Sequence, residues 1–169
     1  MGFTVRRATE QDVEGAFAVM EAGVASLAQK DWYKPDDRDF IHQHITEKGF
    51  TMVAEDENGK VSAFFVVHYP RMGPDNLGRV LDLTEEELLT VAHMESAAVL
   101  PSCRGHKLQA RMLEAAEAEL AGGPFHYLMV TVHPDNVYSL GNMLRHGYQV
   151  VATMKKYGGL DRHILCKQI

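Results

Sequence analysis

The sequence has few cysteines and no long apolar run, and these absences exclude several classes of protein. The two cysteines, Cys103 and Cys166, stand in no secretory context, so we expect reduced thiols and a cytoplasmic protein. No apolar run approaches the length that spans a bilayer, and the N-terminus shows no signal-peptide pattern, so we expect no membrane partner. A formal net charge of -6 argues against a nucleic-acid partner.

Internal repeats, linkers and low-complexity segments are also absent. With 169 residues, 46% hydrophobic and 24% charged, the chain has the composition of an ordinary globular protein. We therefore expect a single domain over 1–169. The chain contains no G-x-G-x-x-G motif, which argues against a nucleotide-binding Rossmann domain.

Apolar periodicity predicts an α/β fold with a central mixed sheet of six to seven strands and about four flanking helices. Strands are expected over 3–8, 50–55, 60–69, 91–100, 125–132, 148–155 and 163–167. Helices are expected over 10–27, 36–48, 106–121 and 136–146, with one or two further turns over 84–89. Trp32 lies between the first two helices, where it either packs between them or lines a pocket.

The segment 91–123 combines an apolar strand, a short basic turn and an amphipathic helix. The helix carries one apolar stripe of helical period, made up of Leu108, Met112, Leu113, Ala116 and Leu120. A helix that begins just after a strand presents unpaired backbone N–H groups and the positive end of its dipole, which together bind anions. Arg104 and Lys107 add two cations at this point. The sequence therefore predicts a phosphate-binding turn here.

Two runs of residues resemble the signatures of the GNAT superfamily of N-acetyltransferases. Residues 99–109, VLPSCRGHKLQ, resemble the acetyl-CoA signature V-x-P-x-x-[QR]-G-x-G-x-[GAQ], with Lys107 in place of the second glycine. Residues 132–148, VHPDNVYSLGNMLRHGY, resemble the second signature, V-x-P-x-N-x-x-[AS]-x-x-x-Y-x-x-x-G-[FY], with Met143 in place of the tyrosine. Two signatures in the right order are far more specific than either one alone.

The resemblance implies acetyl-CoA as the cosubstrate and a GNAT-like fold. In that fold the parallel strands 91–100 and 125–132 splay apart, and the pantetheine arm of CoA lies in the gap against the main chain of the first strand. The cofactor-binding residues would be Ala97, Val99, Arg104, Gly105, His106, Lys107, Leu108, Gln109, Asn136 and Ser139. Asn136 could serve as a helix N-cap, as a ligand to the arm, or as both. For Lys107 we expect a helical φ that leaves its backbone N–H available.

The chemistry implied by the resemblance is acetyl transfer to a primary amine, which needs a base because the amine is protonated near pH 7. Glu95 and His93 are two residues apart, so in a regular strand they share one face, which Ala97 and Val99 would continue. We interpret Glu95 as the base, with a pKa raised by burial, and His93 as its substitute. The alternative is that Glu95 only pairs with a neighbouring group.

The acid that protonates the leaving CoA thiolate is missing from its usual place, because Met143 occupies it. Tyr138 and Tyr148 flank this position without matching it. Either water serves as the acid, or a tyrosine reaches in from elsewhere, or the chain is not an enzyme but a non-catalytic acyl-CoA-binding or sensory domain of the same fold. The acceptor is a small-molecule or protein amine that the sequence does not identify. The sequence also allows a homodimer. It shows no metal-ligand pattern.

Overall fold

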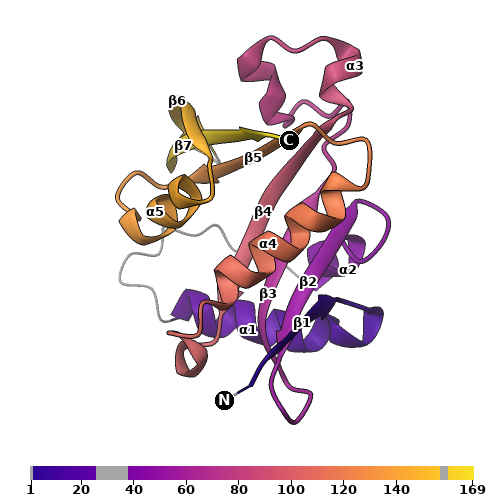
Figure 1. Cartoon of the computed structure of the whole chain (residues 1–169), viewed down its shortest axis with the longest axis vertical. Coiled ribbons are helices and arrows are strands. Elements are labelled where there is room, and N and C mark those ends of the chain that lie inside the picture. Colours follow the sequence, from indigo (N-terminus) through magenta and orange to yellow (C-terminus); the bar gives the residue numbers. More distant parts are fainter. Residues whose placement is uncertain (1, 26–37, 157–159) are drawn as a thin grey trace.

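The computed structural model describes residues 2–25, 38–156 and 160–169 (Figure 1). Its strands are β1 (Thr4–Arg7), β2 (Gly49–Glu55), β3 (Val61–His68), β4 (Val91–Val99), β5 (Tyr127–Val132), β6 (Gln149–Lys156) and β7 (Leu160–Gln168). Its α-helices are α1 (Val13–Ala25), α2 (Arg38–Gln43), α3 (Glu85–Leu88), α4 (Leu108–Ala121) and α5 (Val137–Arg145). Three short 3-10 helices are η1 (Glu10–Asp12), η3 (Leu77–Leu81) and η4 (Pro101–Cys103).

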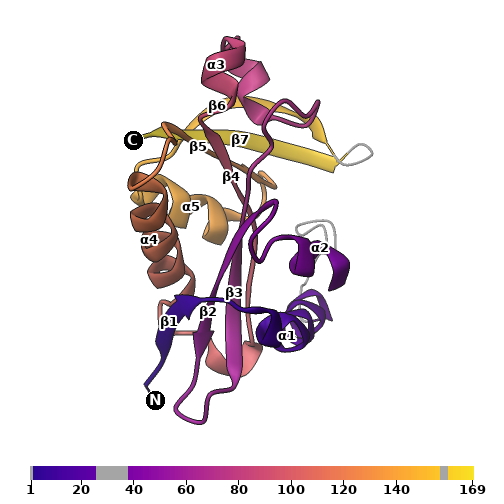
Figure 2. The same cartoon turned by 90° about the vertical axis from the view of Figure 1, so that its right-hand side faces the viewer.

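The strands form one mixed sheet in the order β1-β2-β3-β4-β5-β7-β6, in which only the β4–β5 pair is parallel. Figure 2 shows α4 and α5 on one face of this sheet and α1 and α2 on the other. The predicted α/β class and mixed sheet are thereby confirmed, with seven strands and five α-helices in the described part. No helix among the described residues is long and apolar enough to cross a membrane.

The two parallel strands pair only near their beginnings. Pairing is recorded at Val91–Tyr127, Ala92–Leu128 and His93–Met129, although both strands continue well beyond these positions. The predicted splay is therefore present, and β4 and β5 diverge toward their C-terminal ends. A strand that leaves its neighbour in this way exposes main-chain N–H and C=O groups that a peptide-like ligand can pair with.

A β-bulge interrupts β4 at the point where the strands separate. Met94 lies opposite Val67 and Ser96 lies opposite Val66, so Glu95 is an extra residue without a counterpart on β3. A bulge of this kind bends its strand, increases the local twist and redirects the side chain of the extra residue. Glu95 therefore owes its direction to an irregularity that sequence alternation does not reveal.

The bulge also changes which face the following residues occupy. Ala97 and Val99 pack on the same hydrophobic cluster as Met94, while Ala98 packs on the cluster formed with α1 and α2. In a regular strand Ala97 and Val99 would share a face with His93 instead. The expectation that they continue the face of His93 and Glu95 is wrong, because one inserted residue shifts the alternation by one position.

Most predicted elements lie within a few residues of their expected places, but the second helix is shorter. Within the described residues α2 ends at Gln43 rather than near residue 48. The imidazole Nδ1 of His44 lies 2.6 Å from the Phe40 carbonyl oxygen, and its backbone N–H bonds to Ile41 instead of to Phe40. A side chain that takes the i−4 carbonyl in this way competes with continuation of the helix. The expectation for Trp32 lies outside the described residues.

Candidate active site

A cavity of about 930 Å³ lies where β4 and β5 diverge, bounded by η4, the start of α4, and α5. Ten of the residues predicted for the site line it: Glu95, Ala97, Val99, Arg104, Gly105, Lys107, Leu108, Gln109, Asn136 and Ser139. His93 and His106 are not among its lining residues. The ring of His106 instead packs against Phe3, with the ring centroids 5.0 Å apart. The structure thus brings the two signature segments and Glu95 to one cavity.

The basic turn before α4 has the backbone shape of a glycine-rich loop. Gly105 has a φ of +89°, and a Cβ added there would meet no atom within 4 Å. Lys107 caps α4 with φ +58° and ψ +31°, which is the left-handed region and not the ordinary helical one that we expected. The turn therefore keeps the conformation that glycine favours, although a lysine occupies the position. The N–H groups of the first helical turn, which begins at Leu108, have no partner within the helix.

The N-terminus of α5 contributes the second signature to the cavity. Asn136 caps the helix, its side-chain oxygen accepting a hydrogen bond from the Ser139 backbone N–H at 3.3 Å. Both residues line the cavity. The cap is therefore present, and it places the Asn136 amide at the cavity edge that faces β4.

Hydrogen bonding determines which nitrogen of His93 carries the proton. The Leu77 backbone N–H donates to His93 Nε2 at 3.0 Å, so Nε2 is the unprotonated nitrogen of the neutral ring. The proton on Nδ1 then points toward Glu95 Oε2, 3.3 Å away. His93 is buried, with 3% of its surface exposed, and does not line the cavity, whereas Glu95 does. This arrangement suits a residue that orients a base better than one that acts as the base.

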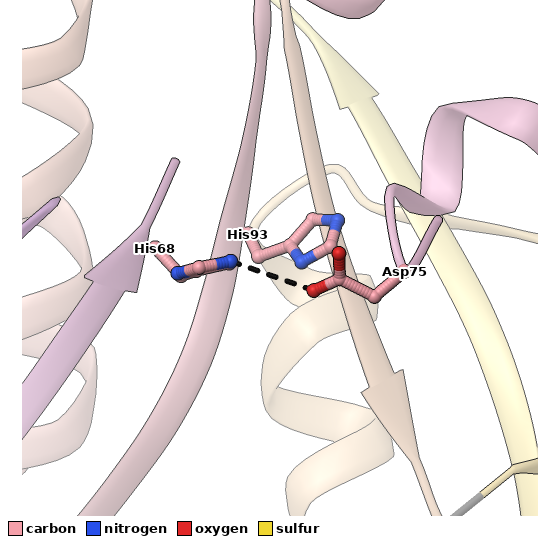
Figure 3. A group of neighbouring side chains, drawn as sticks. All are labelled: His68, Asp75 and His93. Carbon is pink, nitrogen blue, oxygen red and sulfur yellow. Dashed lines mark ion pairs between the residues drawn. The ribbon is translucent and has the colours of Figure 1, made fainter. Parts of the chain in front are cut away.

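Two more histidines lie behind this pair. His44 Nδ1 lies 2.6 Å from the Phe40 carbonyl, which can only accept, so His44 Nε2 accepts from His68 Nδ1 at 2.7 Å. The other nitrogen of His68 faces the Asp75 carboxylate at 3.5 Å. Figure 3 shows His68, Asp75 and His93 converging from β3, from the turn before η3, and from β4. The rings of His68 and His93 are 5.6 Å apart.

These contacts decide the protonation of Glu95. Burial raises its pKa, but the hydrogen bond from His93 and the charges of His93, His68 and His44 outweigh burial, so the pKa lies below its ordinary value. The expectation of a raised pKa is therefore wrong, because the hydrogen bond from His93 and the positive charges of three imidazoles favour the ionised carboxylate. Burial lowers the pKa values of His44 and His68. Glu95 is consequently ionised at neutral pH and ready to accept a proton.

The cluster of His68, Asp75 and His93 also has the spacing of a metal site. One ligand atom from each lies within 4.8 Å of the others. Both nitrogens of His93 are already engaged, however, one by the Leu77 N–H and the other by Glu95. A metal ion would have to replace one of these two hydrogen bonds. We therefore interpret His93 as the support of Glu95, and His68 with Asp75 as a separate pair beside it, and not the three residues as a metal site.

None of the tyrosines near the second signature takes the position of the missing acid. Met143 occupies that position, lines the cavity and is 3% exposed. The Tyr148 hydroxyl is buried elsewhere and donates to Glu117 Oε2 at 2.9 Å, and burial together with Glu117 raises its pKa. Tyr138 lines the cavity but is 77% exposed. Of the two flanking tyrosines, only Tyr138 can reach a ligand in the cavity.

Sequence reasoning missed several residues of the site. Neither His44 nor His68 belongs to a motif, and their contact joins the end of α2 to the end of β3. Asn142 and His146 line the cavity from α5 at helical spacing from Ser139. That spacing was visible in the sequence, and it could have indicated both residues once Asn136 and Ser139 had been assigned to the cavity.

The comparisons with known proteins agree with this geometry. The model of the acetyltransferase (GNAT) family matches residues 19–148. The chain belongs to this family. As a GNAT-family protein it is an acetyl-CoA-dependent N-acetyltransferase, and acetyl-CoA is its cosubstrate. No curated protein matches the sequence.

Solved structures show the same fold at low sequence identity. A ribosomal-protein-alanine N-acetyltransferase from Brucella melitensis is 23% identical, with 98% of this chain and 99% of that chain covered and a TM-score of 0.70. The ribosomal-protein-S18-alanine N-acetyltransferase from Escherichia coli is 17% identical, with 99% and 94% covered and a TM-score of 0.74. The structure of yncA from Salmonella typhimurium with its cofactor acetyl-CoA is 19% identical, with 99% and 94% covered and a TM-score of 0.73.

The residues present suit acetyl-CoA. The open space over Gly105 lets a phosphate approach the backbone, and the N-terminus of α4 points toward it. Arg104 and Lys107 line the same part of the cavity. The diverging end of β4, with Ala97 and Val99, lines the part that would receive the arm. The phosphates and the pantetheine arm of the cofactor therefore each have a matching part of the cavity.

Proposed function

We propose that this acetyltransferase transfers the acetyl group of acetyl-CoA to a primary amine of a small molecule or protein. We also propose that the chain acts in the cytoplasm and that residues 1–169 form one catalytic domain. The observation that carries the proposal is the position of Glu95. It lies at the bulge where β4 leaves β5, lines the cavity, and is held by His93 from the opposite side.

Glu95 acts as the general base in this proposal. A primary amine is protonated near neutral pH and has no free electron pair until it loses a proton. The ionised carboxylate takes that proton, directly or through one water molecule, and the freed nitrogen attacks the thioester carbonyl carbon. The nitrogen then loses its second proton to water, and the bond from carbon to sulfur breaks, which yields the amide and the CoA thiolate. His93 keeps the carboxylate in place without entering the cavity.

The remaining residues bind and position the cofactor. Backbone N–H groups from Gly105 to Gln109 hold the pyrophosphate, with Arg104 and Lys107 adding positive charge. The main chain of Ala97 to Val99 pairs with the amides of the arm, as an added strand would. Asn136 and Ser139 contact the arm from α5. The thiolate takes its proton from water or from Tyr138, because Met143 has none to give.

A screen of amines tests this proposal. The purified protein is incubated with acetyl-CoA and a panel of small-molecule amines and peptides with free N-termini, and the released CoA thiol is measured. We expect release that depends on one class of amine. A calorimetric titration with acetyl-CoA accompanies the screen. Firm binding with no turnover across a broad panel would favour the alternative of a non-catalytic acyl-CoA sensor.

We further propose that two copies of the chain associate. β6 is the last strand of the sheet and exposes Val150, Val151 and Met154. An edge strand with exposed apolar side chains is a template for pairing with another chain. Light scattering after size-exclusion chromatography distinguishes a dimer from a monomer of 18.9 kDa.

A further inference from the structure

One buried amide group on α5 has no hydrogen-bond partner. Asn142 lines the cavity with 7% of its surface exposed, and its side-chain nitrogen Nδ2 makes no hydrogen bond within the described structure. Buried donors in folded proteins are almost always paired, and each exception calls for an explanation. The donor atom itself is shielded from solvent, but its residue lines a ligand cavity, so a rotation of the side chain that brings Nδ2 to a ligand acceptor explains the unpaired donor.

The position of Asn142 on the helix supports this explanation. Five of the cavity-lining residues of α5 and its caps follow helical spacing and form one stripe: Asn136, Ser139, Asn142, Met143 and His146. Tyr138 and Arg145 line the cavity beside this stripe. Asn142 lies in the middle of this stripe, beside Met143. Its backbone carbonyl is already engaged, accepting from the backbone N–H and the Nδ1 of His146 at 3.2 and 2.7 Å. Only the side chain is left to interact with an occupant of the cavity.

The surroundings of Asn142 indicate the kind of acceptor. An amide nitrogen is a neutral donor, and its neighbour Met143 is apolar and buried. Arg104 and Lys107 lie in the turn before α4, and Arg145, which also lines the cavity, lies in the last turn of α5 beyond Asn142 and Met143. A carbonyl oxygen is the neutral acceptor that an acyl-CoA offers, in the two amides of its pantetheine arm and in its thioester.

We propose that Asn142 Nδ2 donates a hydrogen bond to a carbonyl oxygen in the pantetheine–thioester part of bound acyl-CoA. The assignment rests on the proposed acyl-CoA site and adds a positioning residue to it. Asn142 fixes the arm from α5 while the main chain of β4 holds it from the other side. The family signature places no requirement on this position, so the contact belongs to this chain.

Calorimetry on the full chain tests the assignment with Asn142→Leu, which keeps the side-chain size and removes the donor. Three ligands are titrated: acetyl-CoA, CoA, and adenosine 3′,5′-bisphosphate, which lacks the arm. We expect Asn142→Leu to bind acetyl-CoA about 5- to 100-fold more weakly and the bisphosphate within twofold of the parent, with an equal loss for CoA only where the acceptor is an amide of the arm. The melting temperature should stay the same or rise, because the unpaired donor of the free protein has gone.

A second variant and a control keep the outcome clear. Asn142→Ala should lose affinity for the same ligands as Asn142→Leu, even if the leucine packs poorly. The control is Gln149→Met, which changes an exposed amide on β6 outside the cavity and should bind all three ligands like the parent. An equal loss for CoA and acetyl-CoA assigns an amide carbonyl of the arm, and a larger loss for acetyl-CoA assigns the thioester. Unchanged affinity for both acetyl-CoA and CoA, or an equal loss for the bisphosphate, would overturn the assignment. A parent protein that binds no acetyl-CoA would overturn the proposed function instead.

Discussion

His93 and Glu95 meet through Nδ1 and Oε2, 3.3 Å apart, across the β-bulge of β4. The bulge lets Glu95 line the cofactor cavity while its carboxylate still reaches a histidine that does not. His93 is fixed in turn by the backbone N–H of Leu77, which dictates its tautomer. A positioned carboxylate next to an acyl-donor cavity can take a proton from an ammonium group, and its lowered pKa keeps it ionised at neutral pH while making it a weaker base.

Replacing Glu95 by Gln should separate catalysis from binding. The substitution keeps the size of the side chain and removes its ability to accept a proton. Turnover with any accepted amine should fall by about 10²-fold or more, the usual contribution of a general base. Acetyl-CoA affinity, measured by calorimetry, should stay within a few-fold because the phosphate loop is unchanged.

Glu86→Gln serves as the matched control, because Glu86 is an exposed carboxylate on α3. It should turn over like the parent. Normal turnover by Glu95→Gln would transfer the role of base to water, since neither nitrogen of His93 faces the cavity.

Removing His93 should change the pH profile more than the affinity for acetyl-CoA. The hydrogen bond and charge of His93 lower the pKa of Glu95 against the opposing effect of burial. In His93→Asn burial is less opposed, so the pKa of Glu95 rises and the acidic limb of kcat/KM moves to higher pH. His126→Asn, which changes an exposed histidine, provides the control. If the acidic limb of kcat/KM in His93→Asn lay at the same pH as in the parent, His93 would not affect the pKa of Glu95 and would serve only in packing.

Local signals predicted much of this fold. The apolar stripe of 108–120 is α4, the Asn58-Gly59 turn joins β2 to β3, and Thr84 and Glu87 form the capping box of α3. Each of these depends on residues that are close in sequence, so period and turn chemistry are enough to identify them. The signatures likewise lie in continuous stretches, which is why ten of the predicted site residues line one cavity.

What the sequence did not predict depends on contacts between distant segments. The bulge at Glu95 is visible only in the register of β4 against β3, and it reversed the expected face of Ala97 and Val99. The lowered pKa of Glu95 depends on histidines from three different elements, among them His44 and His68. No periodicity brings such residues together.

The buried histidines should make the protein less stable in mild acid. The folded-state pKa values of His44 and His68 lie below the ordinary value of about 6.5, chiefly through burial. At a pH between the folded and unfolded pKa values, the unfolded chain binds more protons than the folded protein. The stability that neutral histidines confer is therefore fully present above about pH 6.5, and it is lost as the pH falls through the folded pKa.

Urea unfolding from pH 7.5 to pH 5 measures this effect. We expect the free energy of unfolding to fall with pH, with each histidine contributing at most about 1.4 kcal/mol per pH unit. His44→Gln and His68→Gln should each flatten the slope. Equal slopes in the parent and both variants would show that other groups cause the acid sensitivity.

Replacing Lys107 by Gly should stabilise the protein. Lys107 has a φ of +58°, a conformation that costs a residue with a Cβ about 1–2 kcal/mol. Glycine relieves that cost, but its greater conformational entropy stabilises the unfolded chain by about 0.5–1 kcal/mol. The free energy of unfolding should therefore rise by about 0.5 kcal/mol. Thermal and urea unfolding measure it. Lys107→Ala keeps a Cβ in the same conformation, so its stability should not rise. If Lys107→Ala were stabilised as much as Lys107→Gly, the cause would be the loss of charge repulsion and not the relief of backbone strain.

The same loop should bind CoA mainly through its backbone, so Gly105→Val should lose more CoA affinity than Lys107→Ala. Gly105 has a φ of +89°, which valine rarely adopts, and the space above it is open for a phosphate that a valine side chain would obstruct. Lys107 contributes one exposed charge, whose removal should weaken binding by no more than about fivefold. Calorimetric titration of CoA measures both variants, and their melting temperatures show whether Gly105→Val is still folded. A larger loss in Lys107→Ala would identify the lysine, and not the backbone N–H groups, as the main phosphate ligand.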